Sequence, residues 1–169
     1  MNTTITRVHA RAIWDSRGRP TVEAEVELAG GATGRASAPA GASRGAHEAI
    51  DLRDGGEHLA GLGVANAVAL ARTEVAPRLT GMDAADQSAI DAALCELDGT
   101  PNKARLGANA TVAISLAVLH AAAAAAHEPT WRWLAQGRPV RLPLPEIQIF
   151  GGGAHAGRRG APARGLPHQ

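Results

Sequence analysis

The stretch that decides the fold is residues 5–28, ITRVHARAIWDSRGRPTVEAEVEL. Apolar and polar residues roughly alternate from Ile5 to Ile13 and again from Thr21 to Leu28, a period of two that indicates half-buried strands. The six residues between these runs, DSRGRP, favour a turn. A glycine pair then separates the second run from a third expected strand, residues 33–38. The sequence therefore predicts a three-stranded antiparallel meander.

After a glycine-rich stretch, 39–61, which is expected to form a long mobile loop, the pattern becomes helical. The predicted helices span residues 64–79, 83–97 with Asp83 as the cap, 109–127 and 130–136. The apolar stretch 108–126 is rich in alanine, so a buried helix is expected there rather than a membrane span. Strands followed by helices, without alternation, predict an α+β fold consisting of the meander and a helical bundle.

Three segments are expected along the chain. Residues 1–137 are predicted to form the folded domain, and residues 138–157 are interpreted as a linker followed by the start of something new. Within that linker, Ile147 and Ile149 suggest one short strand between Pro143 and Phe150. Residues 158–169 contain almost no large apolar side chain, so a disordered tail is expected there.

Composition narrows the function classes. The 169 residues are 45% hydrophobic, enough for one ordinary core, and their formal net charge is +1. So small a charge gives no reason to expect a nucleic-acid or membrane partner. Cys95 is the only cysteine, which excludes an internal disulfide, and residues 1–11 lack the apolar core of a secretion signal. A cytoplasmic location is therefore the expectation.

Five strings of residues resemble the enolase family in their order and spacing. They are DSRG with PTVE (15–23), GAS with HEA (41–49), DGT with NK (98–103), GANA (107–110) and GGAHAG (152–157). The resemblance implies an enolase amino-terminal domain followed by the first residues of a TIM-type barrel. Such a barrel needs about 250 residues, so the catalytic barrel is expected to be missing and the chain to be truncated. A change of reading frame near Arg159 is one hypothesis for that.

Two site residues follow from the resemblance. In enolases a serine on a closing loop contributes to the second magnesium site, which implies a metal-binding role for Ser43. The matching family histidine lies beside the phosphorylated substrate, which implies substrate binding by His155. The family pattern is not kept at Ala40, where serine is usual, at Arg44, where threonine is usual, and at Gly151, where asparagine is usual.

The implied activity is the magnesium-dependent dehydration of 2-phosphoglycerate to phosphoenolpyruvate in glycolysis. Because the catalytic groups of enolases belong to the barrel, no catalytic residue is assigned here and the chain alone is expected to be inactive. Two alternatives stay open: an enolase relative acting on another phosphorylated or phosphonate acid, and a non-catalytic lid domain that associates with a separate barrel. A homodimer is implied only for a complete enolase.

Two further features have simpler interpretations. His47 is a lone histidine on a polar loop, and such residues are more often solvated than catalytic. The stretch from Asp98 to Lys103 combines a glycine with a lysine, as phosphate-binding turns do, but a helix end at Gly99 followed by a turn is the favoured interpretation.

Overall fold

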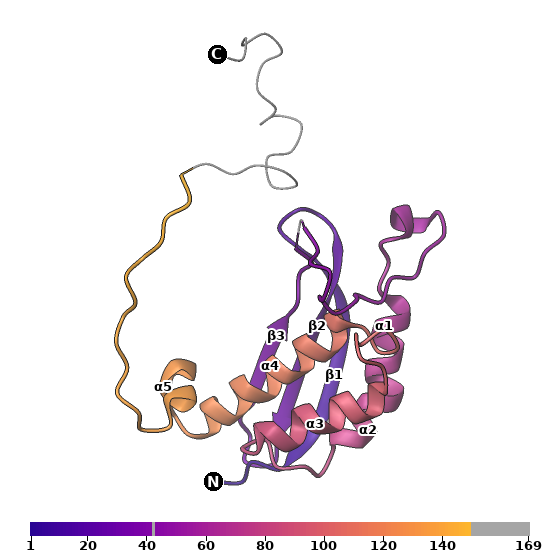
Figure 1. Cartoon of the computed structure of the whole chain (residues 1–169). Helices are drawn as coiled ribbons and strands as arrows, with labels where there is room; N and C mark the ends of the chain where they lie inside the picture. The colour runs from indigo at the N-terminus through magenta and orange to yellow at the C-terminus, as the bar shows by residue number, and fades with distance from the viewer. Residues whose placement is uncertain (42, 150–169) are drawn as a thin grey trace, which may run out of the picture.

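The computed structural model describes residues 1–41 and 43–149, in which three strands form one antiparallel sheet (Figure 1). The strands are β1 (Ile5–Trp14), β2 (Pro20–Leu28) and β3 (Thr33–Ser37), in the order β1-β2-β3. The predicted meander is therefore confirmed, with bounds within one residue of those expected. Residues 15–19, DSRGR, form the turn between β1 and β2, and Pro20 is the first residue of β2.

One face of the sheet is apolar and the other is charged. On β2 the apolar set Val22, Ala24, Val26 and Leu28 is at most 3% exposed. The glutamates between them lie on the opposite face and pair with arginines of both neighbouring strands. These pairs are Arg7–Glu27, Arg11–Glu23 and Arg35–Glu25. Exposed ion pairs contribute little to stability, so burial of the apolar face sets the register.

The first helical run has three consecutive parts. They are α1 (Ala65–Leu70), a π-helical turn (Ala71–Val75) and α2 (Ala76–Leu79). The predicted extent is confirmed, whereas the π turn is not visible in the sequence pattern. From this turn the Arg72 Nε donates a hydrogen bond of 2.7 Å to the carbonyl of Ala10, which joins the helical run to the edge of β1.

Helix α3 (Gln87–Asp98) begins later than expected. Asp86, not Asp83, is its cap, because the Asp86 side chain accepts the backbone N–H of Ala89 at 3.0 Å. The carboxylate of Asp83 instead accepts the Thr3 hydroxyl and the Ala85 N–H, and so fastens the N-terminal segment. The assignment of Asp83 as the cap was wrong, since a turn separates the two aspartates.

Helix α4 (Ala108–Ala125) lies across β2 and β3 and provides most of the helical part of the core (Figure 1). It is long and apolar enough to cross a membrane by length and composition, with a mean hydropathy of 1.6, yet 61% of it is buried against the domain. The prediction of a buried helix is confirmed. No charged side chain occurs in it, and its His120 Nδ1 donates to the carbonyl of Arg35 at 2.8 Å.

The chain after α4 departs from one expectation. Helix α5 (Thr130–Ala135) is present as predicted and ends at Gln136, whose φ is 49°. The short strand expected from Pro143 was wrong for the part described, because residues 143–149 form no strand. Two prolines there lack the N–H that a ladder needs, and no strand of the described chain lies beside them. His155, Gly151 and the expected tail 158–169 lie outside the described residues.

Candidate functional site

An open cleft of about 410 Å³ separates the loop that follows β3 from the beginning of α4. One wall contains Ala40, Arg44 and Asp51, and the other contains Asn109 and Val112. Two of the strings singled out in the sequence, GAS with HEA and GANA, are thus brought to opposite sides of one cleft although they are about sixty residues apart. This cleft is the candidate site.

The first end of the loop is fastened to the β1–β2 turn and to β2. The Thr21 hydroxyl donates to the carbonyl of Ala38 at 2.6 Å, and the Arg17 Nη1 donates to the carbonyl of Ala40 at 3.3 Å. Asp15 organises this turn by accepting two backbone N–H groups, from Arg17 at 2.8 Å and Arg19 at 2.9 Å. The bond from Arg19 is the main reason why the pKa of Asp15 lies below its ordinary value.

The second end of the loop is fastened to the N-terminus of α4 by Asn109, which is 1% exposed. Its Oδ1 accepts the backbone N–H of Leu52 at 3.2 Å, and its Nδ2 donates to the carbonyl of Leu52 at 3.0 Å. Close by, the backbone N–H of Ala108 donates to the carbonyl of Ile50 at 2.8 Å. The amide of Asn109 bonds both the backbone N–H and the backbone carbonyl of Leu52, which holds this end of the loop against the N-terminus of α4.

Any replacement of Asn109 that removes its side-chain amide is expected to lower the free energy of unfolding. Asn109→Ala leaves both backbone groups of Leu52 without partners and is expected to lower the free energy of unfolding by about 2 kcal/mol. Asn109→Asp keeps the shape but places an oxygen against the carbonyl of Leu52, so a similar loss is expected at neutral pH. Urea unfolding measures both losses. The exposed Asn66→Ala is the control, and equal stability of all three variants would contradict this role.

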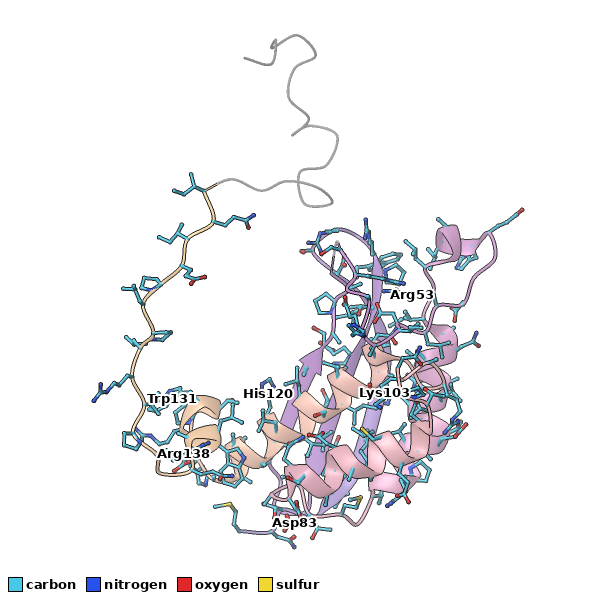
Figure 2. The ribbon with its side chains drawn as sticks, viewed as in Figure 1. Arg53, Asp83, Lys103, His120, Trp131 and Arg138 are labelled. Atoms are coloured by element: carbon cyan, nitrogen blue, oxygen red, sulfur yellow. The ribbon has the colours of Figure 1, made fainter. Side chains whose placement is uncertain are left out.

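Arg53 joins the second end of the loop to the start of β2. Its Nη1 donates to the carbonyls of Pro20 at 2.6 Å and Leu62 at 2.9 Å, while its Nη2 pairs with the Asp51 carboxylate at 3.0 Å. The side chains of Arg53 and Asp51 are only 15% and 16% exposed. Figure 2 shows Arg53 near the end of the sheet where the loop begins. The pair therefore holds the chain that follows the loop against the start of β2.

Ser43 and Arg44 are exposed in the loop that follows β3. Ala40 and Arg44, the two described departures from the family pattern, both line the cleft. Glu48 is engaged within the loop, where its Oε2 accepts the backbone N–H of Gly45 at 2.8 Å. His47 is exposed, in keeping with the solvated interpretation.

The loop residues do not by themselves make a metal site. A serine hydroxyl is a hard oxygen of the kind that magnesium prefers, but the ion takes about six ligands. Residues 1–41 and 43–149 contain no cluster of three His, Cys, Asp or Glu side chains that could hold an ion. The Ser43 hydroxyl could therefore supply one of these ligands and not a whole site.

The stretch from Asp98 to Lys103 is a structural turn, as the favoured interpretation predicted. Gly99 ends α3 with a φ of 69°, and the Lys103 ammonium donates to the carbonyl of Thr100 at 3.4 Å. The carboxylate of Asp98 accepts the backbone N–H of Leu106 at 2.8 Å and that of Thr100 at 3.0 Å. These groups bind one another within the turn.

The fold and the cleft define a class of protein: an α+β domain that presents a loop with an exposed serine, and whose described residues contain no cluster of three His, Cys, Asp or Glu side chains able to hold a metal ion. Comparison with known proteins gives the family. The enolase N-terminal domain family matches residues 5–134, and the chain belongs to that family. The chain is also 54% identical over 153 residues to the enolase of Aeropyrum pernix, a match covering 90% of this chain and 35% of that relative.

Proposed function

We propose that this chain is the loop-bearing part of an enolase that converts 2-phosphoglycerate to phosphoenolpyruvate with magnesium. The observation that carries the proposal is the family match over residues 5–134, combined with the position of the GAS string beside the cleft. Because the chain spans only about a third of the length of the relative, the reaction is assigned to this chain together with residues that it does not contain.

In this proposal the chain supplies positioning rather than acid–base chemistry. Gly41 lets the loop backbone approach a ligand closely, and the Ser43 hydroxyl offers a hard oxygen to a cation bound with the substrate. Magnesium, when bound, would balance negative charge on the reacting acid. His155 is proposed as a contact to the phosphorylated substrate. A cytoplasmic location, and a homodimer for a complete enolase, belong to the same proposal.

The experiment is a graft. The chain replaces the matched segment of the Aeropyrum pernix enolase, and the formation of phosphoenolpyruvate from 2-phosphoglycerate is followed by absorbance with magnesium present. We expect turnover from the graft and none above buffer from the 169-residue chain alone. Turnover by the chain alone would contradict the assignment of the chemistry to other residues. An inactive graft that is folded and binds no substrate would overturn the proposed function.

Ser43→Ala in the graft is expected to lower kcat about 100-fold and to raise the magnesium concentration needed for half-maximal rate. One ligand of a bound ion is lost, and even the loss of groups that only support metal ligands lowers metal affinity or activity about 10–100-fold. Glu96→Ala is the matched control, because its side chain is 79% exposed and far from the loop in sequence. Equal rates for both variants would exclude a role for Ser43.

A second candidate function has a specific observation in its favour. Ala40 and Arg44, which replace a serine and a threonine usual in the family, both line the cleft. An added guanidinium favours a substrate with a differently placed anionic group, such as another phosphorylated or phosphonate acid. The graft separates the two functions, since preference for such an acid over 2-phosphoglycerate would favour the second. If the chain restores turnover only as a separate polypeptide beside a barrel, it is a lid domain.

A further inference from the structure

The loop wall of the cleft is fastened to the N-terminus of α4 through its backbone. The N–H of Ile50 donates to the carbonyl of Asn102 at 2.9 Å, and the carbonyl of Ile50 accepts the N–H of Ala108 at 2.8 Å. Two residues later, the side-chain amide of Asn109 bonds the N–H and the carbonyl of Leu52. The backbone polar groups of Ile50 and Leu52 are therefore all paired with the start of α4 or with the turn that precedes it.

The two residues that flank Ile50 line the cleft. Ala49 and Asp51 belong to its loop wall, and Val112 of α4 belongs to the opposite wall. Adjacent residues are joined by rigid peptide planes, so neither flanking residue can keep its place if Ile50 leaves the helix. The contact with α4 therefore sets the separation of the two walls at this end of the cleft.

Gly107 lies at the centre of this contact, since it immediately precedes α4 and has a φ of 89°. A Cβ at this position would lie 2.6 Å from the Leu52 Cβ and 2.7 Å from the Leu52 backbone nitrogen. It would also meet the Asn109 Oδ1, the atom that accepts the Leu52 N–H. Non-bonded carbon atoms normally stay about 3.5–4.0 Å apart, so a side chain here would push Leu52 off the helix end.

We propose that Gly107 is a positioning residue of the candidate site. Because it has no side chain, the backbone of Leu52 lies directly against the start of α4, and this approach fixes where Ala49 and Asp51 stand in the cleft. The inference rests on the proposed function in so far as the cleft takes part in the enolase reaction. The GANA string then contains two positioning residues, the glycine that permits the approach and the asparagine that holds Leu52 there.

Alanine at two glycines of the same backbone conformation provides the test. Gly81 has a φ of 91°, and a Cβ there meets no atom within 4 Å. Gly81→Ala therefore shares the backbone strain of Gly107→Ala and lacks its contact with Leu52. A difference between the two variants at the cleft is due to that contact.

Amide hydrogen exchange in the 169-residue chain, followed by NMR, measures the contact directly. In Gly107→Ala the Leu52 amide is expected to exchange about tenfold faster than in the original chain, the effect of losing one hydrogen bond. In Gly81→Ala it is expected to accelerate no more than the amide of Val26, which reports on the central strand β2. Equal acceleration of the Leu52 amide in both variants would overturn the inference.

Asn109→Ala provides the comparison if Gly107→Ala does not fold. It frees Leu52 from the helix without placing a Cβ against it. Faster exchange is then expected at the neighbouring Ile50 amide, whose own acceptor, the Asn102 carbonyl, is unchanged. An Ile50 amide that exchanges at the original rate would overturn the inference, because the loop wall would keep its place without the contact.

Turnover in the active graft separates this inference from the proposed function. Gly107→Ala is expected to raise KM for 2-phosphoglycerate about tenfold with kcat nearly unchanged, because a smaller fraction of the protein holds the cleft walls at the competent separation. Gly81→Ala is expected to leave KM unchanged. If the graft is inactive while the exchange contrast holds, the positioning of the cleft wall stands and the enolase assignment fails. If the graft is active and both variants have the same KM, the positioning role of Gly107 fails alone.

Discussion

Replacing Gly34 by alanine is expected to lower the melting temperature of the chain by about 10 °C. A Cβ at this position of β3 would meet the carbonyl oxygen of Ala117 at 2.1 Å and the backbone nitrogen of Ala121 at 2.2 Å. Both contacts are with the backbone of α4, which cannot rotate away as a side chain can. Overpacking of this kind costs about 3 kcal/mol, and about 3 °C per kcal/mol is usual at this size.

The control is Gly45→Ala, because a Cβ there meets only the far end of the Glu48 side chain, at 4.0 Å. Its melting temperature is expected to stay within about 2 °C of the original. Adding Ala121→Gly to the Gly34→Ala variant is not expected to restore the melting temperature. That second substitution removes a side chain, whereas the clash is with backbone atoms of α4. Differential scanning calorimetry measures all of these. A Gly34→Ala variant as stable as the original chain would mean that α4 does not lie this close to β3.

Replacing Asp98 by alanine is expected to lower the free energy of unfolding by about 3 kcal/mol. The residue is 2% exposed at the end of α3, and its carboxylate accepts the N–H of Leu106, the N–H of Thr100 and the Thr100 hydroxyl. Bonds to a charged acceptor contribute about 1.5–3 kcal/mol, and removal leaves the buried N–H of Leu106 unsatisfied. Asp98→Asn, which keeps one acceptor oxygen, is expected to lose about 2 kcal/mol. Urea unfolding at neutral pH measures both, with the exposed Glu96→Gln as the control.

The same carboxylate predicts how stability changes with acid. Burial alone would raise the pKa of Asp98, but the bonds from Leu106 and Thr100 outweigh it and bring the pKa below its ordinary value of 3.8. The folded state therefore binds its proton less readily than the unfolded state, so the stabilisation is complete well above pH 3.8 and is lost as the pH falls through the lowered value. The stability gap between the original chain and Asp98→Asn is expected to narrow below about pH 4. A gap that widens in acid would contradict the assignment.

The strands and most helix bounds could be predicted because each depends on a local pattern. The alternation of Val22, Ala24, Val26 and Leu28 requires one face of β2 to be buried, whatever lies against it. The cap of α3 could not be predicted in this way, since Asp83 and Asp86 are both good caps and the choice depends on a bond from Thr3, eighty residues earlier. The strand expected near Ile147 failed because a strand needs a partner, and apolar alternation does not supply one.

The candidate site was predicted only in part. The loop itself carries a recognisable string of residues, whereas the roles of the residues that hold the loop in place could not be derived from the sequence. The GAS string pointed to Ser43, and its role stays a prediction. Asn109 was marked only as part of the GANA string, without a role, and nothing in the sequence distinguishes Arg53 from other polar residues. The roles of both residues arise from contacts with the backbone of Pro20 and Leu52. The buried carboxylate of Asp98 was seen only as part of a turn. Hydrogen bonds to backbone carbonyls far away in the chain do not depend on a repeating pattern of residue types, so they cannot be recognised from the sequence.

The π turn between α1 and α2 has a consequence for how the first helical run meets the sheet. Its innermost residues, Ala67, Ala71, Val75 and Leu79, recur every four positions and are all at most 1% exposed. In an ordinary helix a step of four overshoots a 3.6-residue turn by about 40°, so such a row would spiral away from its neighbour within three steps. The wider turn removes part of that drift, so all four of these side chains stay buried where the helical run packs against β1.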